Sequence, residues 1–383
     1  MSSSDAASPV TERPYRGLQV VDFTTTIAGP YCTRLLADLG ADVVKVEAPE
    51  GEMTRRRPPV RNGFSSAFGQ LNAGKRSVVI DLKTSAGIEA ALRLAGRADV
   101  LVENFRPGVM DRLGLGYERL SESNPRLIYC SISGYGQTGP SAHLPAYAPV
   151  MHAASGYDLA HLSYQEGRER PDWCSVYTAD VVAGLYAFAA IGPALHQRAR
   201  TGCGQRIDVS MLEAMLTLCL NEVQGAQFDT PLLRKSLFGP IRTADGYVMA
   251  AVASEKTFAA LAGVIGRPEL VTDRRFADYL TRRANWQQFF EEVEKWSATL
   301  TSEQCLSALA RSGVPASPYR TVAEALADPQ LVHREALATV RDGGGEFQAV
   351  NPPFRMSDAE ASIGATVPAI GQHTAEVLSE IRR

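Results

Sequence analysis

One acidic residue lies where a carboxylate could do covalent chemistry. Asp180 belongs to a stretch of small and apolar residues that predicts a long buried helix. Thr178 is the expected N-cap of this helix, and Gly202 is its expected stop. Asp180 would then lie in the first turn, where free N–H groups and the helix dipole favour an ionised carboxylate. Such a carboxylate can act as a nucleophile, although an aspartate in a first turn more often only caps its helix.

Composition and length fit a cytoplasmic protein with a large core. The chain has 383 residues, of which 45% are hydrophobic and 21% charged, and its net charge is -3. This length predicts two domains, and the balanced charge predicts neither a nucleic-acid nor a membrane partner. We expect no apolar run long enough to span a membrane. Residues 1–15 are rich in Ser, Ala and Pro without the pattern of a signal peptide, so they predict a disordered tail.

Neither a metal nor a permanently bound cofactor is predicted. The six cysteines are scattered and form no CxxC pair, which argues against a zinc site and against a disulfide framework. The six histidines form no HxxxH or HxH cluster. Catalysis would therefore rest on ordinary side chains and on the substrates themselves.

Alternating strands and helices predict an α/β fold with a Rossmann-like parallel sheet. Buried strands are expected at residues 18–23, 41–47, 77–80, 99–102 and 127–132. The first turn has no GxGxxG sequence, so the dinucleotide fingerprint is absent. Ligands of such sheets bind beyond the carboxyl ends of the strands. The loops at residues 24–30, 104–108 and 134–140 all follow strands, so we expect them to share one rim.

The predicted domain boundaries divide the chain into four parts after the tail. Residues 16–223 form the large domain, and residues 224–240 form a linker. Residues 241–318 form a smaller α+β domain, which begins with a hairpin that turns at Asp245 and Gly246. Residues 319–383 return to the large domain and end in a helix that packs on it.

Ten motifs in one order resemble the family III CoA-transferases, the family of formyl-CoA transferase, carnitine CoA-transferases and α-methylacyl-CoA racemase. The resemblance extends from about Arg16 to Leu378. The motifs are VVDFTTTIAGPYCTRLLADLGADVVKVE (20–47), GEMTR (51–55), NAGKRSVVIDLKT (72–84), ADVLVENFRPGVMDRLGLGY (98–117), NPRLIYCSISGYGQTGP (124–140), TADVVAGLYA (178–187), TGCGQRIDVSMLEAML (201–216), RTADGYVMAAV (242–252), GVPASPYRTVAEALADPQ (313–330) and GQHTAEVL (371–378).

The resemblance implies a ring-shaped subunit in an interlocked homodimer, with acyl-CoA and a small carboxylic acid as substrates. It also implies that Asp180 attacks the acyl-CoA thioester and then carries CoA as an aspartyl thioester. This covalent route would divide one difficult exchange into easier steps. The resemblance thus favours the catalytic interpretation of Asp180 over the capping one.

Other residues are assigned to the CoA site by the same resemblance. Lys75 and Arg112 match residues at the nucleotide end of CoA, where a cation suits a phosphate, although an exposed cation is usually only solvated. The further assignments are Asn104 and Phe105 in the ENF stretch, Ala28 after the first strand, and Tyr147.

Two departures from relatives bear on the reaction. Tyr147 stands where the racemase has its catalytic histidine, while His143 and His152 are offset from that position. A phenol, with a pKa near ~10, is a poor acid–base partner at neutral pH, so this departure favours transfer. The glycine run of formyl-CoA transferase is reduced to Gly239, and Ile27 replaces its glutamine, so oxalate is not the expected acceptor.

Two other functions remain open at this point. A 2-methylacyl-CoA racemase would exchange a proton at Cα, with Asp180 and with Glu255, which matches the racemase's acidic residue in the small domain. A non-catalytic CoA-binding protein is the second alternative, and the intact Asp180 motif argues against it. The acyl donor and the acceptor acid are not indicated by the sequence.

Overall fold

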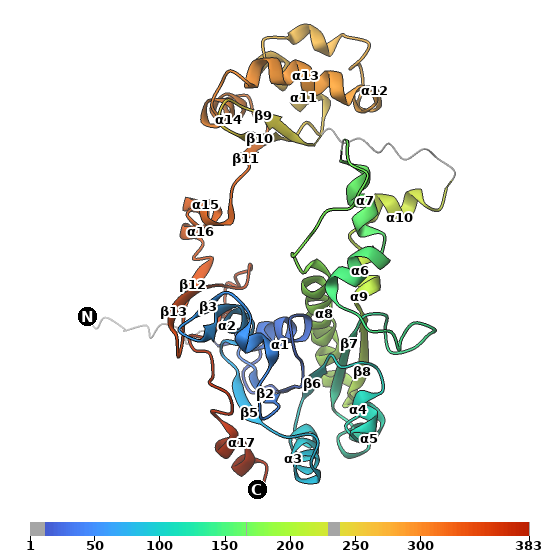
Figure 1. The fold of residues 1–383 in the computed structure, drawn as a ribbon, viewed down its shortest axis with the longest axis vertical. Helices are drawn as coiled ribbons and strands as arrows, with labels where there is room; N and C mark the ends of the chain where they lie inside the picture. Colours follow the sequence, from blue (N-terminus) through green and yellow to red (C-terminus); the bar gives the residue numbers. More distant parts are fainter. Residues whose placement is uncertain (1–11, 166, 229–237, 383) are drawn as a thin grey trace, which may run out of the picture. The chain divides into compact units, whose positions relative to one another are not determined.

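A computed structural model of the 383-residue chain describes residues 12–165, 167–228 and 238–382 (Figure 1). The chain divides into two compact units. The first unit comprises the residues up to Asp158, Trp173–Leu220 and the residues from Gln330 onward. The second unit comprises Leu159–Asp172 and Asn221–Pro329.

A six-stranded parallel sheet forms the centre of the first unit and confirms the predicted α/β fold. Its strands are β1 (Gln19–Asp22), β2 (Asp42–Glu47), β5 (Arg76–Val79), β6 (Val100–Glu103), β7 (Ile128–Ser133) and β8 (Gln205–Ser210). Their order across the sheet is β5-β2-β1-β6-β7-β8, and every neighbouring pair is parallel. The chain order reverses between β1 and β6, which is where open sheets of this kind bind ligands.

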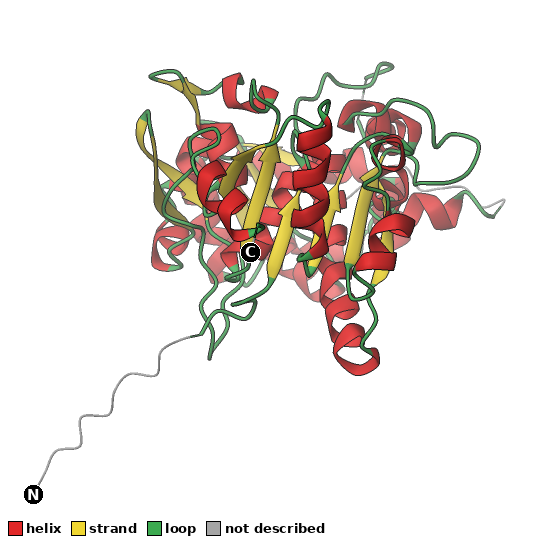
Figure 2. Cartoon of the chain, turned by 90° about the horizontal axis from the view of Figure 1, so that it is seen from below, coloured by secondary structure: helices red, strands yellow, loops and turns green. Residues whose placement is uncertain are grey.

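Helices cover both faces of this sheet because successive strand residues point to opposite sides (Figure 2). Val20 packs in one core with α1 (Ala28–Asp38) and α8 (Thr178–Thr201). The next residue, Val21, packs in the other core with α3 (Ser85–Gly96) and α17 (Thr374–Glu380). The same alternation divides Val43 from Val44. Near-continuous apolar strands are therefore the signature of a sheet that is buried on both sides.

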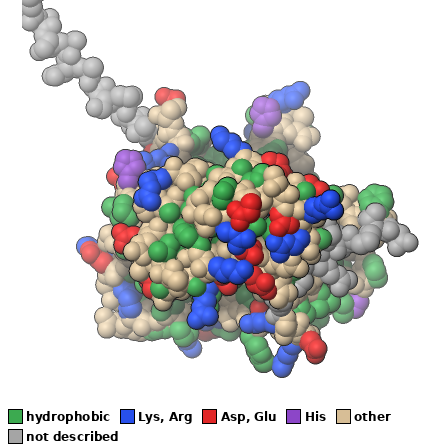
Figure 3. Space-filling model, turned by 90° about the horizontal axis from the view of Figure 1, so that it is seen from above, with side chains coloured by type: hydrophobic (Ala, Val, Ile, Leu, Met, Phe, Trp, Pro, Cys, Tyr) green, Lys and Arg blue, Asp and Glu red, His purple; other side chains and the backbone are tan. Residues whose placement is uncertain are grey.

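The second unit is a small α+β assembly. Its antiparallel sheet has the order β11-β10-β9, from β9 (Pro240–Arg242), β10 (Tyr247–Ala250) and β11 (Ala316–Pro318). The hairpin between β9 and β10 turns at the predicted place, with Tyr247 opposite Arg242. Helices α11 (Glu255–Val264), α13 (Trp286–Ser297) and α14 (Ser302–Arg311) complete its core. Acidic and basic side chains are interspersed on the face drawn in Figure 3.

The residues from Gln330 onward belong to the first unit. Val377 of α17 is buried in that unit, and the backbone N–H of His373 donates to the carbonyl of Ser77 at 2.9 Å. A hairpin of β12 (Leu337–Asp342) and β13 (Gly345–Val350), which the sequence analysis did not predict, precedes it. Its turn, at Asp342-Gly343-Gly344-Gly345, carried a recognisable hairpin signal.

Several boundaries differ from the predicted ones. Residues 1–11 of the expected tail lie outside the described residues, but Arg13 forms an ion pair with Glu360 at 2.6 Å, so the tail's last residues join the fold. The segment Leu159–Asp172 belongs to the second unit, where the Tyr164 hydroxyl donates to Glu222. Of the expected linker, residues 229–237 lie outside the described residues.

Candidate active site

Asp180 lies in the first turn of α8, where the sequence placed it. The helix ends at Gly202, whose φ of 78° is in the left-handed region, so the predicted stop is confirmed. The predicted N-cap is wrong by one residue. Tyr177 is the N-cap, because its carbonyl accepts the first helical hydrogen bond from the N–H of Val181 at 3.1 Å. Thr178 is the first helical residue, and the Tyr177 side chain makes no capping hydrogen bond.

A buried histidine fixes the start of α8. The backbone N–H of Ala179 donates to Nε2 of His152 at 3.1 Å, and His152 is 3% exposed. This residue lies on α6 (Ala148–Ala154). Burial lowers the pKa of His152, against the opposing charge of Asp158, so the neutral, accepting imidazole is the favoured form. His152 thus satisfies one of the free N–H groups of the first turn, immediately before Asp180.

One face of α8 packs closely on its neighbours, and the other is exposed. Ala183 and Gly184 are buried, and α8 contacts α1, β7 and β8. An added Cβ on Gly184 would lie 2.5 Å from the carbonyl oxygen of Ala28, so only glycine permits this approach of α1 and α8. Leu185 on the opposite face is 41% exposed. The sequence predicts no apolar run of membrane-spanning length, yet α8 is long and apolar enough to cross a membrane by length and composition alone.

The close approach brings the Asp180 carboxyl group to the start of α1. Partial burial raises the pKa of Asp180 to about 6, and two groups oppose this effect: the Arg57 guanidinium and a backbone hydrogen bond from Ala28. The carboxylate is therefore desolvated enough to be reactive and remains ionised at neutral pH. A carboxylate held in this way is suited to nucleophilic attack.

A cavity of about 290 Å³ contains Asp180 and the predicted rim. Three loops that follow parallel strands line it, as expected: the turn after β1, the loop after β6 and the end of β7. Asn104 joins the first two, because its side chain accepts from the N–H of Thr25 at 2.9 Å and donates to the carbonyl of Thr25 at 2.8 Å. The switch point of the sheet is therefore also where the candidate nucleophile lies.

A second cavity, of about 300 Å³, adjoins the first. Thr25, Thr26 and Phe105 line both of them. The second cavity is lined further by apolar side chains, among them Phe23 and Ile80, and by charged residues. These charged residues are Lys45, Glu47, Glu52, Asp81 and the exposed Lys83. Two cavities joined at one turn could hold a long ligand with its reactive end at Asp180.

Most of the predicted CoA-site residues lie together. Ala28, Asn104, Phe105 and Tyr147 line the cavity that contains Asp180. Tyr147 is 62% exposed. Arg112 is exposed at the end of the short helix α4 (Val109–Arg112), next to this region in the chain but outside the lining of either cavity.

Lys75 lies elsewhere, in the core. Its side chain is 0% exposed, and Nζ lies 3.0 Å from Asp22 and 2.8 Å from both Thr33 and Asn72. Burial lowers its pKa to about 8, while Asp22 opposes that shift. All of its donors are directed to buried oxygens, so the position shows a structural role and gives no support to a contact with the nucleotide.

Three residues of the site region were missed by sequence reasoning. Lys83 lies in the same motif as Lys75, and its position directly after a predicted strand was an available signal. Arg57 follows the GEMTR motif, but nothing local indicates that its charge lowers the pKa of Asp180. His152 is offset in sequence from the racemase position, but it accepts a hydrogen bond from the first turn of α8. Glu255 belongs to the second unit and pairs there with Arg282.

Comparison with known proteins settles the family. The model of CoA-transferase family III matches residues 15–374, nearly the whole chain. The chain belongs to the family III CoA-transferases. It is 36% identical to a succinyl-CoA:mesaconate CoA-transferase of Haloarcula hispanica, with 95% of each chain covered. It is 37% identical to an acetyl-CoA:oxalate CoA-transferase of Acetobacter aceti, covering 90% of this chain and 89% of that one.

Solved structures agree with this family. A CAIB/BAIF family protein from Brucella suis superposes with a TM-score of 0.83 at 34% identity, over 97% of this chain and 100% of that one. The chain is therefore an acyl-CoA:carboxylate CoA-transferase of family III, and CoA or acyl-CoA is its substrate.

Proposed function

We propose that this family III transferase moves CoA from an acyl-CoA donor to a carboxylic acid through covalent intermediates on Asp180. The observation that carries the proposal is the desolvated Asp180 carboxylate, which faces a cavity at the switch point of the sheet. Its helix start, its approach to Ala28 and its raised pKa all suit a nucleophile better than a capping residue.

The proposed reaction begins with attack of an Asp180 carboxylate oxygen on the thioester carbonyl carbon. The C–S bond breaks, CoA leaves as a thiolate, and a mixed anhydride joins the acyl group to Asp180. The thiolate then attacks the aspartyl carbonyl, which releases the donor carboxylate and leaves Asp180 as a CoA thioester. The acceptor carboxylate repeats these two steps in reverse, which regenerates Asp180 and yields the new acyl-CoA. Charge and atoms balance without any redox change.

We further propose that the two adjoining cavities hold CoA. The cavity around Asp180 would take the thioester end, beside Ala28, Asn104 and Tyr147. The cavity beyond Phe105 would take the nucleotide end, because apolar side chains and the Lys83 ammonium suit an adenine ring and a phosphate. Arg112 stays a prediction for the outer phosphates.

A homodimer remains part of the proposal. Apolar side chains on the open face of α8 support it, since Val181 is 37% exposed, Leu185 41% and Tyr186 44%. Burying that face against a second copy would remove these side chains from water. Light scattering at micromolar concentration should give twice the 41.3 kDa mass of the chain, and a monomer would contradict the dimer.

The experiment for the proposed chemistry is incubation of the protein with an acyl-CoA alone. We expect an acyl or CoA adduct on the peptide that carries Asp180, and hydroxylamine should release it, because anhydrides and thioesters react with hydroxylamine. A racemase would form no adduct and would instead exchange deuterium from heavy water into Cα of a 2-methylacyl-CoA. Exchange without an adduct would overturn the proposal, and binding without either reaction would indicate a non-catalytic CoA-binding protein.

A further inference from the structure

The turn after β1 contains a backbone conformation that its sequence does not favour. Thr26 has a φ of 72°, in the left-handed region, although it is a β-branched residue. Residues in this conformation persist where the surroundings over-determine them, and they gather at functional sites. Thr26 lines both cavities, and it precedes Ala28 by two residues. Something in the structure must hold this turn.

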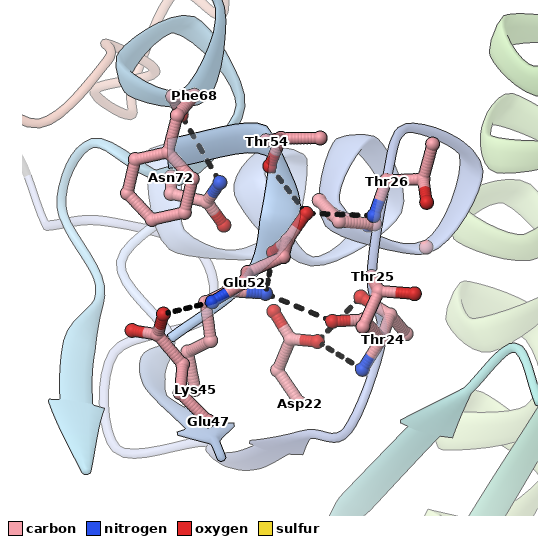
Figure 4. Close-up of polar contacts among 12 residues, drawn as sticks. Asp22, Thr24, Thr25, Thr26, Lys45, Glu47, Glu52, Thr54, Phe68 and Asn72 are labelled. Carbon is pink, nitrogen blue, oxygen red and sulfur yellow. Dashed lines mark hydrogen bonds and ion pairs between the residues drawn. The ribbon is translucent and has the colours of Figure 1, made fainter. Parts of the chain in front are cut away.

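A buried carboxylate holds Thr26 from one side. The backbone N–H of Thr26 donates to Oε1 of Glu52 at 2.7 Å, and the hydroxyl of Thr54 donates to the same oxygen. Glu52 precedes the short 3-10 helix Met53–Arg56. Its side chain is 3% exposed and bonds to the turn, and Glu52 is also among the residues that line the second cavity. Figure 4 shows Glu52 next to Thr26 and Lys45.

A buried ammonium fixes that carboxylate and also the turn. Nζ of Lys45 lies 2.7 Å from Oε2 of Glu52, and it donates to the carbonyl oxygen of Thr24 at 2.8 Å. The Lys45 side chain is 0% exposed. Thr24 is held a second time by Asp22, which accepts from its N–H at 2.8 Å and from its hydroxyl at 2.5 Å. The backbone is therefore held on both sides of Thr25, by Lys45 at Thr24 and by Glu52 at Thr26.

The consequence of this arrangement appears two residues later. Ala28 begins α1 and lines the same cavity as Asp180, and its backbone N–H lowers the pKa of the Asp180 carboxyl group against the effect of burial. If Thr26 relaxed to a negative φ, the direction of the chain into Ala28 would change. The Ala28 N–H would then no longer point at the Asp180 carboxyl group. During transfer, negative charge develops on the aspartyl carbonyl oxygen, where a fixed backbone N–H is an effective stabiliser.

We infer that Glu52, supported by Lys45, is a positioning residue for the reaction: it holds Thr26 in its left-handed conformation so that the Ala28 N–H is aimed at the carboxyl group of Asp180. This inference rests on the proposed function. It assigns the Lys45–Glu52 pair a role in catalytic rate, beyond any role in stability. Neither side chain touches the reacting atoms, so both act through the turn.

The test is a cycle of Glu52→Gln and Thr26→Gly, measured as kcat and KM of the folded protein. Glu52→Gln should lower kcat by about 100-fold, the size expected when a positioned group is displaced by about 1 Å, and should change KM for acyl-CoA less than threefold. Thr26→Gly in the Glu52→Gln protein should recover at least tenfold of that loss, because glycine adopts a positive φ without strain. A purely stabilising ion pair would give no recovery.

A matched control for Glu52→Gln lies on β2, the strand that carries Lys45. Asp42 begins β2 and pairs with Arg76 at 2.6 Å, at the end of the strand opposite to Glu47. Asp42→Asn should lower the melting temperature and leave kcat unchanged. If Glu52→Gln does not fold, Lys45→Met/Glu52→Met replaces both buried charges together, which usually preserves folding, and should show the same loss of kcat.

The outcomes separate this inference from the proposed function. Wild-type protein that forms no adduct on Asp180 contradicts the proposed function. Wild-type protein that forms the adduct, together with a Glu52→Gln variant that forms it at the wild-type rate, contradicts only the positioning role. Loss of kcat in Glu52→Gln without recovery by Thr26→Gly also overturns it.

Discussion

Two aspartates of the first unit, Asp22, which is buried, and Asp180, which is partly buried, have opposite surroundings. Asp22, at the end of β1, is 0% exposed and accepts bonds from Lys75, Thr24 and Thr33. Burial opposes its ionisation, but Lys75 and Lys45 more than compensate and hold its pKa well below the usual range. Asp180 has only Arg57 and Ala28 to oppose burial, and its pKa is raised to about 6.

The difference separates a structural charge from a reactive one. A carboxylate with a full set of partners is stabilised in its ionised form and has little tendency to attack a carbonyl carbon. A carboxylate that is desolvated but incompletely paired keeps its reactivity, at a cost to the folded state. Each of the following predictions tests one side of this contrast.

The largest expected effect is on activity when Asp180 is removed. Asp180→Ala and Asp180→Asn should each lower kcat by about 10⁴-fold or more, because neither side chain can form the anhydride. Both variants should fold. Steady-state assays with the purified variants check this, and activity within tenfold of wild type would remove Asp180 from the covalent role.

Asp22→Asn should instead act on stability. Removing one partner of a buried ion pair leaves Lys75 without its counter-charge, so we expect a loss of about 3–5 kcal/mol in the free energy of unfolding. Urea unfolding followed by circular dichroism measures this loss. A change below about 1 kcal/mol would show that the two aspartates do not differ as described.

Asp180→Asn should stabilise the protein at neutral pH. A carboxyl group with a raised folded-state pKa binds protons more tightly in the native state, so its contribution to stability falls as pH rises from about 4 to about 6. Above that window the neutral variant should be more stable by about 1–2 kcal/mol, and below pH 4 the difference should vanish. Thermal unfolding of the wild type and of Asp180→Asn at pH 4 and pH 8 measures this difference. A stability gain of the variant that is larger at pH 4 than at pH 8 would contradict the prediction.

Two lysines of one motif give a third contrast. Lys83→Ala should raise KM for acyl-CoA about tenfold with little change in kcat, as expected when uniform binding to a phosphate is lost. Lys75→Met should mainly lower stability, because its ammonium bonds to buried oxygens. Measuring KM and the unfolding midpoint for both variants tests these two roles. A raised KM in Lys75→Met alone would show that Lys75, and not Lys83, binds the phosphate.

The smallest expected effect concerns pH. Activity should fall on the acid side with a pKa of about 6 in kcat/KM, because only ionised Asp180 attacks. The Arg57 charge lowers that pKa, so Arg57→Gln should move the acid limb upward by about 0.5–1 pH unit. Arg56→Gln, on the exposed neighbouring residue, serves as the control and should leave the limb in place. If the acid limb of kcat/KM stays in place in Arg57→Gln, Arg57 and Asp180 do not interact.

The contrast also explains what the sequence could and could not predict. Asp180 and its three loops were predictable, because a local helix signal and a general rule about parallel sheets sufficed. Lys75 and Lys83 could not be distinguished in this way. Burial of the Lys75 ammonium depends on Asp22, which lies 53 residues earlier in the chain. Ion pairs between residues that are far apart in the chain give no signal in the local sequence.

The positions of Arg57 and Glu52 were unpredictable for the same reason. Their roles depend on how the segment after β2 folds onto the turn after β1, and the motif GEMTR carries no signal of that contact. The start of α8 differs from the predicted one by one residue because Thr178 is a good N-cap by type, whereas the N–H of Val181 donates to the carbonyl of Tyr177 and places Thr178 inside the helix.

The most direct test of covalent transfer through Asp180 follows oxygen atoms in a single turnover. An acceptor acid labelled with ¹⁸O at both carboxylate oxygens is added to protein that carries the aspartyl-CoA thioester, and the peptide with Asp180 is then weighed. Attack of the acceptor on the aspartyl carbonyl, followed by thiolate attack on the acceptor carbonyl, leaves one labelled oxygen on Asp180. We predict that the peptide gains one ¹⁸O in step with the new acyl-CoA. Formation of the new acyl-CoA without label on Asp180 would contradict the account.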